Sequence, residues 1–133
     1  MTKVFMKAFD SARPHGPSLP DGQFHSLVED RSGLTVNLKK PLDDDLVWSA
    51  NFQFPTSYRA SDEGVLLAYW NDAMQGGNES LWELFESEYQ SWLGVVSFGM
   101  HPLDRPVRHF LIVTDFQCVE VLTETEPTVV VFD

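Results

Sequence analysis

The stretch Leu34–Phe54 reads LTVNLKKPLDDDLVWSANFQF, and both of its arms alternate in polarity. In Leu34–Lys39 and again in Leu46–Phe54, every second residue is apolar and most of the residues between are polar. That period is typical of a strand with one buried face. The connection Pro41–Asp45 is rich in turn formers, so the stretch predicts an antiparallel hairpin that Pro55 ends.

Turn formers and further strands flank this hairpin. Residues 10–23 hold three prolines and two glycines, which predicts an exposed loop, and Phe24–Glu29 follows as a strand. Toward the other end of the chain, β-branched residues predict three more strands, Val107–Thr114, Gln117–Thr123 and Thr128–Phe132.

The middle of the chain favours two helices. Ser61 caps the first, in which apolar residues fill one broad arc until a pair of glycines ends it. Asn78 caps the second, which runs over about Glu79–Leu93. This order predicts an α+β fold, a mainly antiparallel sheet with two helices packed on one face, in a single domain over residues 1–133.

The composition is that of a globular protein, with 43% hydrophobic and 13% aromatic residues. A net charge of −11 argues against nucleic acid and anionic membranes as partners, because both are bound by clustered Lys and Arg. The first residues lack a long apolar stretch and so do not read as a signal peptide, and no run approaches the ~20 apolar residues of a membrane helix. Cys118 is the only cysteine, which fits a reducing compartment, and we expect a cytoplasmic protein.

The net charge is concentrated in the second half of the sequence. Residues 1–60 hold seven acids and seven bases, whereas residues 61–133 hold thirteen acids and two bases. A field of one sign serves solubility or the steering of an oppositely charged partner. We therefore expect this protein to bind a basic partner.

The second predicted helix carries the sharpest candidate for that contact, an acidic stripe formed by Glu79, Glu83 and Glu86. Residues 61–93 contain no Lys or Arg, so no pair of opposite charges relieves these acids. A solvated helix face is the plainer interpretation. We predict that the acidic stripe binds the partner, together with Asp72 and the hairpin-turn acids Asp43, Asp44 and Asp45. Trp82 or Trp70 is the predicted aromatic anchor, because binding hot spots favour Trp.

Residues that could do chemistry are few. Glu88 lies in the apolar arc of its helix, either at the edge or paired with an arginine, and His101 and His109 are more typical of structural positions. Cys118 reads as a buried hydrophobe. The histidines show no metal-ligand spacing and no phosphate-binding or nucleophile motif occurs, so we expect no metal, cofactor or catalytic residue.

Four segments taken together resemble a family of small bacterial immunity proteins, which are encoded beside polymorphic secreted toxins and neutralise them. The segments span a little over half of the chain, and Phe110 stands where the family has tyrosine: Tyr58–Glu63, Ser87–Leu93, His109–Thr114, and Cys118–Leu122 followed by Pro127. The resemblance implies a non-enzymatic inhibitor of a toxin domain. It does not imply which surface binds.

The sequence is compatible with three functions. The first is an immunity protein whose acidic face occludes the active site of a basic toxin domain. The second is a small enzyme or ligand-binding module with Glu88, His101 or His109 in a cleft between helices and sheet. The third is an accessory or structural subunit. A toxin gene immediately upstream would favour the first, and a pocket with two convergent titratable groups would favour the second.

Overall fold

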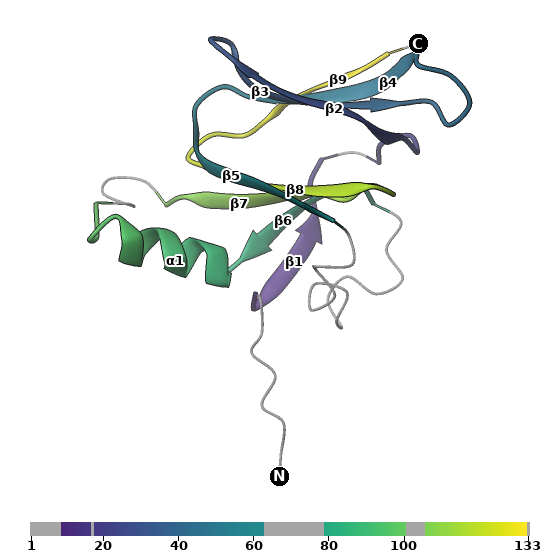
Figure 1. Cartoon of the computed structure of the whole chain (residues 1–133). Coiled ribbons are helices and arrows are strands. Elements are labelled where there is room, and N and C mark those ends of the chain that lie inside the picture. The colour runs from purple at the N-terminus through teal and green to yellow at the C-terminus, as the bar shows by residue number, and fades with distance from the viewer. Residues whose placement is uncertain (1–8, 17, 63–78, 101–105, 133) are drawn as a thin grey trace.

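Two antiparallel sheets form the framework of the computed structural model, which describes residues 9–16, 18–62, 79–100 and 106–132. The larger sheet has the strand order β1-β6-β7-β8-β5 and the smaller has the order β2-β3-β4-β9 (Figure 1). The bounds are β1 Ser11–Pro14, β2 Gln23–Asp30, β3 Gly33–Lys39, β4 Leu46–Phe52, β5 Pro55–Asp62, β6 Leu81–Phe85, α1 Glu88–Val96, β7 Arg108–Ile112, β8 Gln117–Thr123 and β9 Thr128–Val131.

The four-stranded sheet is built around the predicted hairpin, which is confirmed. β3 pairs with β4 from Leu34 opposite Phe52 to Leu38 opposite Trp48, so the apolar residues of both strands share one face. β2 adds to the free edge of β3, and β9 adds to that of β4. After β4 the chain crosses to the other sheet, where β5 pairs with β8.

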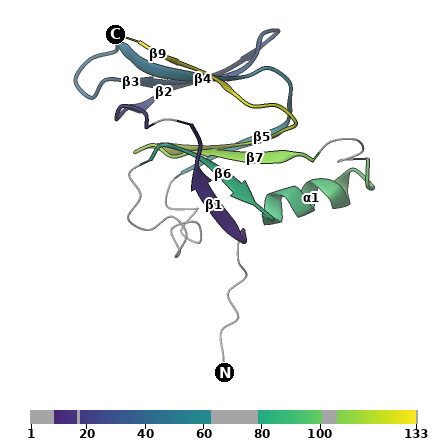
Figure 2. The same ribbon diagram turned by 180° about the vertical axis from the view of Figure 1, so that it is seen from behind.

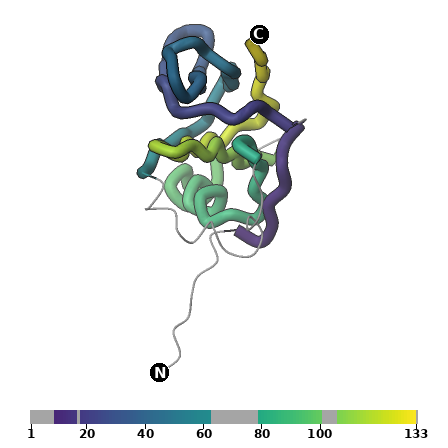
Figure 3. Tube along the Cα trace, turned by 90° about the vertical axis from the view of Figure 1, so that its right-hand side faces the viewer, coloured from purple at the N-terminus to yellow at the C-terminus, as the bar shows by residue number. Residues whose placement is uncertain are grey.

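One apolar cluster joins the two sheets. The inward residues of β3 and β4 pack against alternate residues of the five-stranded sheet, namely Leu81, Phe110, Ile112, Val119 and Val121. The intervening residues of β8 face the opposite way, where Leu122 packs against Tyr89 and Leu93 of α1. The layers are therefore four-stranded sheet, five-stranded sheet and helix (Figure 3).

The prediction of two helices packed on a sheet is wrong, because the described part of the chain is mainly β and its helix is the short α1. Residues 81–85, expected inside the second helix, form β6 between β1 and β7 (Figure 2). Leu81 packs between the sheets while Trp82 and Leu84 pack on the other face. A short strand buried on both faces, apolar here except for Glu83, does not alternate in polarity, so periodicity does not separate it from a helix.

Two further expectations are corrected. Ser61 was predicted to cap the first helix, but it lies in β5 opposite Cys118 of β8. The rest of that helix, with Trp70 and Asp72, lies outside the described residues. The predicted loop over 10–23 contains β1, in which Arg13 lies opposite Glu83.

Candidate functional site

His109 of β7 lies at the centre of a buried polar network on the helix-facing side of the five-stranded sheet. Its Nδ1 is 2.7 Å from Ser87 Oγ, and its Nε2 is 2.9 Å from Glu120 Oε1. All three residues are 0% exposed. Burial lowers the pKa of His109 more than the neighbouring Glu120 raises it. The ring is therefore neutral near pH 7, with Nε2–H donating to Glu120 and Nδ1 accepting from the Ser87 hydroxyl.

Arg59 of β5 continues this network toward the surface. Its Nε donates to Glu120 Oε2 at 2.6 Å, and its Nη2 donates to Glu120 Oε1 at 3.2 Å. The guanidinium also lies over the ring of Tyr89, 4.0 Å from its centroid, and the Tyr89 hydroxyl is 2.7 Å from Ser57 Oγ. The network thus ties α1 to β5, β7 and β8.

Serine, histidine and glutamate in contact are also the composition of a nucleophilic triad. Here the same groups also make structural contacts at the start of α1. Ser87 is the N-cap of α1: its Oγ accepts from Gln90 N–H, and Gln90 Oε1 accepts from Ser87 N–H, which makes a capping box. Ser87 is fully buried, and its hydroxyl oxygen is engaged by Gln90 N–H and by His109. Both nitrogens of His109 are engaged as well, by Ser87 and Glu120.

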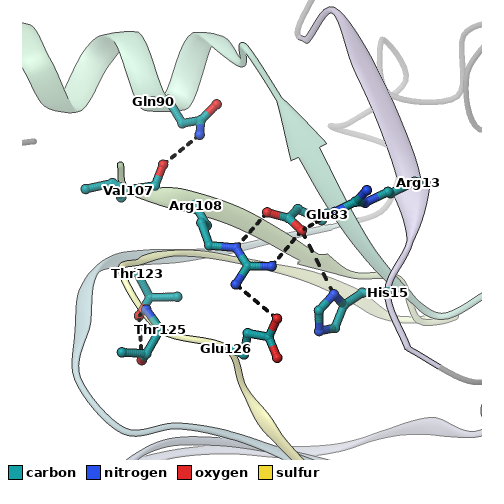
Figure 4. A network of polar contacts seen from close by, with 9 residues as sticks. All are labelled: Arg13, His15, Glu83, Gln90, Val107, Arg108, Thr123, Thr125 and Glu126. Carbon is teal, nitrogen blue, oxygen red and sulfur yellow. Dashed lines mark hydrogen bonds and ion pairs between the residues drawn. The ribbon is translucent and has the colours of Figure 1, made fainter. Parts of the chain in front are cut away.

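A second network surrounds Glu83 of β6 between the sheets. Figure 4 shows Arg13, His15 and Arg108 converging on its carboxylate. Arg108 donates from Nε and Nη2 at 2.8 Å each, and it also reaches Glu126 at 3.2 Å. Burial raises the pKa of Glu83, but the hydrogen bond and charge of Arg108, with Arg13 and His15, outweigh it and hold the pKa below its usual value.

The acidic stripe does not exist as predicted. Glu83 is 3% exposed, Glu79 is half-buried ahead of β6, and only Glu86 is exposed. The reason is that residues 81–85 form a strand, so only Glu83 lies in β6, while Glu79 precedes it and Glu86 follows it, and the helical alignment of the three carboxylates is lost. Trp82 is also buried, and its Nε1 donates to the Glu79 carbonyl, so it belongs to the core and not to an exposed anchor.

The other predicted residues fall into three groups. Asp43, Asp44 and Asp45 are exposed in the turn between β3 and β4, in the layer farthest from α1. Glu88 is exposed at the start of α1, at the edge of the apolar arc as one interpretation had it. Cys118 is buried among apolar residues as predicted, whereas His101 lies outside the described residues.

Apolar side chains reach solvent along α1 and the turn that follows it. The exposed ones are Trp92, Val95, Val96, Phe98 and Met100. The sequence pattern missed this surface because a helix beginning at Glu79 placed Trp92 in its buried arc. A hollow beside the first turn of α1 is lined by Glu86, Ser87, Gln90, Ser91, Leu93, Pro106 and Val107, of which Glu86 alone is titratable.

Comparison with protein-family models, curated proteins and solved structures finds no match. Within the described residues, no cluster of three or more His, Cys, Asp or Glu side chains is arranged to hold a metal ion. None of the helices described there has the length and apolar character needed to cross a membrane.

Proposed function

We propose that this chain is an immunity protein, a cytoplasmic inhibitor that binds a basic bacterial toxin domain and neutralises it. The observation that carries the proposal is the division of charge between interior and surface. Two carboxylates, Glu83 and Glu120, are buried, and both are held by arginines. The surface is left with a large excess of acid. The resemblance of the sequence to toxin-immunity proteins supports the same function.

A count of the described charged residues gives the excess of acid over base on the surface. Arg13 and Arg108 contact Glu83, and Arg59 contacts Glu120, so three of the six described bases serve the interior carboxylates. Thirteen acids of the described residues are exposed: Asp10, Asp21, Glu29, Asp30, Asp43, Asp44, Asp45, Asp62, Glu86, Glu88, Asp115, Glu124 and Glu126. Such a surface attracts a cationic protein over long range and speeds its association.

The polar residues with catalytic potential support a binding role. The hydroxyl, imidazole and carboxylate of the His109 network are fully buried and hold α1 to the sheet. An enzyme needs such groups within reach of a substrate. An accessory subunit remains the alternative that gene neighbourhood separates from an immunity protein.

Co-expression tests the proposal. The toxin domain is taken from the gene immediately upstream of this one and expressed in a susceptible host with and without this chain. We expect the toxin domain alone to stop growth and this chain to restore it. If this chain does not restore growth, or if the upstream gene encodes no toxic domain, the proposed function is wrong.

Binding kinetics test the role of the charge. Between 50 and 500 mM salt, we expect the association rate to fall by about tenfold or more, while the dissociation rate changes little. Paired reversals, Glu86→Lys with Glu88→Lys and Asp43→Lys with Asp44→Lys, measure the contribution of each end of the molecule. An association rate that does not depend on salt would remove charge from the mechanism.

A further inference from the structure

Backbone strain marks both ends of α1. Among the described residues, the non-glycine residues with positive φ are Glu86 at 52° and Phe98 at 53°, and both are exposed. A non-glycine residue in this region is strained, and such strain tends to gather at functional sites. Glu86 directly precedes the N-cap and Phe98 directly follows the C-cap. A strained residue therefore lies at each end of α1.

The end of α1 shows why Phe98 is unexpected. Gly99 N–H donates to the Gly94 carbonyl at 2.9 Å, and Phe98 N–H donates to the Val95 carbonyl at 3.2 Å. These two bonds make a Schellman motif, in which the position of Phe98 is usually glycine. Phe98 is 95% exposed, so hardly any packing within the chain offsets its strained backbone. Folding alone does not account for phenylalanine here.

Further apolar side chains accompany Phe98. Trp92 is 47% exposed, and its ring packs on Tyr89 with a centroid distance of 5.5 Å. The Tyr89 ring is itself held in place by the Arg59 guanidinium stacked over it, so the Trp92 indole packs against a side chain of fixed position. Val95 lies one turn further along the same side of α1 and is exposed, as is Met100 after the turn. A half-exposed, pre-positioned Trp beside other apolar groups is typical of a binding hot spot.

The charges around these residues indicate the partner. Glu88 lies on the same side of α1 as Trp92, one turn before it, and is exposed. Residues 79–100 contain no Lys or Arg, and the neighbouring cation that lies over Tyr89, Arg59, is paired with Glu120. We infer that the α1 surface, formed by Glu88, Trp92, Val95, Phe98 and Met100, docks into an apolar pocket with a basic rim on a partner protein. This inference rests on the proposed function and names the surface that performs it.

A second copy of the chain is a poorer occupant of the α1 surface. Two chains with a net charge of −11 each repel one another, and an isologous contact would place Glu88 of each copy near the same acidic surface. A partner with an apolar pocket and a basic rim is complementary both to the apolar side chains of the α1 surface and to Glu88.

Phe98→Gly separates binding from folding. Glycine suits the Schellman position, so we expect the thermal midpoint to stay unchanged or rise while affinity for the upstream toxin domain falls at least about tenfold. Trp92→Ser should lose affinity to a similar extent. Leu42→Ser is the control, since Leu42 is 98% exposed on the β3–β4 turn and outside the α1 surface. It should bind like the original chain.

The outcomes are distinct. A toxin domain that binds the original chain and the Phe98→Gly and Trp92→Ser variants equally would overturn the α1 surface and leave the proposed function standing. No binding by the original chain would overturn both. If Phe98→Gly lowers the thermal midpoint, Phe98→Asn, which also tolerates positive φ, makes the same comparison. A dimer seen by light scattering that Phe98→Gly abolishes would overturn the inference in favour of self-association.

Discussion

Replacing Arg59 by leucine should destabilise the protein more than any exposed charge change. Glu120 is 0% exposed and keeps two contacts to Arg59, at 2.6 and 3.2 Å. At about 3 Å and an effective dielectric constant near 20, unit charges attract by about 5 kcal/mol. The Arg59 side chain is 44% exposed, but removing it leaves the fully buried Glu120 charge without its cation, so we expect a cost near the low end of the range for broken buried pairs, about 3 kcal/mol. Leucine keeps an apolar group over Tyr89, so the loss is chiefly electrostatic.

A double-mutant cycle isolates that loss. Glu120→Gln removes the negative charge but keeps an oxygen that accepts from His109 Nε2–H. We therefore expect Arg59→Leu with Glu120→Gln to be more stable than Arg59→Leu alone, by about 1 to 3 kcal/mol. Urea unfolding followed by tryptophan fluorescence at pH 8, where His109 is neutral in the folded and unfolded chain, measures all four proteins.

An exposed pair provides the control. Lys39 Nζ lies 3.9 Å from Asp44 Oδ1, and the Asp44 side chain is 92% exposed. Asp44→Asn should change the unfolding free energy by no more than about 0.5 kcal/mol. If Arg59→Leu stays within about 1 kcal/mol of the original chain, or Glu120→Gln gives no rescue, then the buried carboxylate does not depend on Arg59 and the account of this network is wrong.

Three further predictions concern other sites. Glu83→Lys should lower the unfolding free energy by about 4 kcal/mol or more in urea denaturation, since it sets a third cation beside Arg108 and Arg13, whereas exposed Glu86→Lys should cost less than about 1 kcal/mol. The pKa of His109 is lower in the folded chain than its ordinary 6.5, so the unfolded chain binds more protons as pH falls. Stability should therefore decline from about pH 7 toward the folded pKa, and the slope should flatten in His109→Gln. Gly33→Ala should lower the thermal midpoint by an amount equivalent to about 2 to 4 kcal/mol, because φ is +108° and the new Cβ would press on the Phe52 carbonyl oxygen; Gly16→Ala, with open space around it, should cost less.

The sequence predicted the strands whose two faces differ or whose residues are β-branched. β3 and β4 alternate because one face packs against the other sheet and the other carries hydrogen-bonded Asn and Ser side chains, as in Ser49 to Asn37. β6 gave no such pattern, because both of its faces are buried. The start of α1 did carry a usable signal. Ser87 and Gln90 have the spacing of a capping box, which marks Ser87 as an N-cap and ends any earlier helix before it.

The buried carboxylates were hidden for a different reason. Glu83 and Glu120 each meet an arginine that lies far away in the sequence: Arg108 comes 25 residues after Glu83, and Arg59 comes 61 residues before Glu120. Local pattern contains no information about such a pairing. An acid among apolar residues, as at Glu120 between Val119 and Val121, indicates a buried partner without naming it. The exposed side of α1 was likewise invisible until the strand before it was recognised.

The folded protein distributes charge differently from the two halves of its sequence. The first sixty residues balance as a sequence, but Arg13 and Arg59 from that half neutralise Glu83 and Glu120 of the other half. The acids left without a buried role are spread over both sheets and the start of α1. A field distributed in this way attracts a basic partner from many directions but does not orient it. Orientation then requires a local feature, and the α1 surface, with a strained phenylalanine and a fixed tryptophan, supplies one.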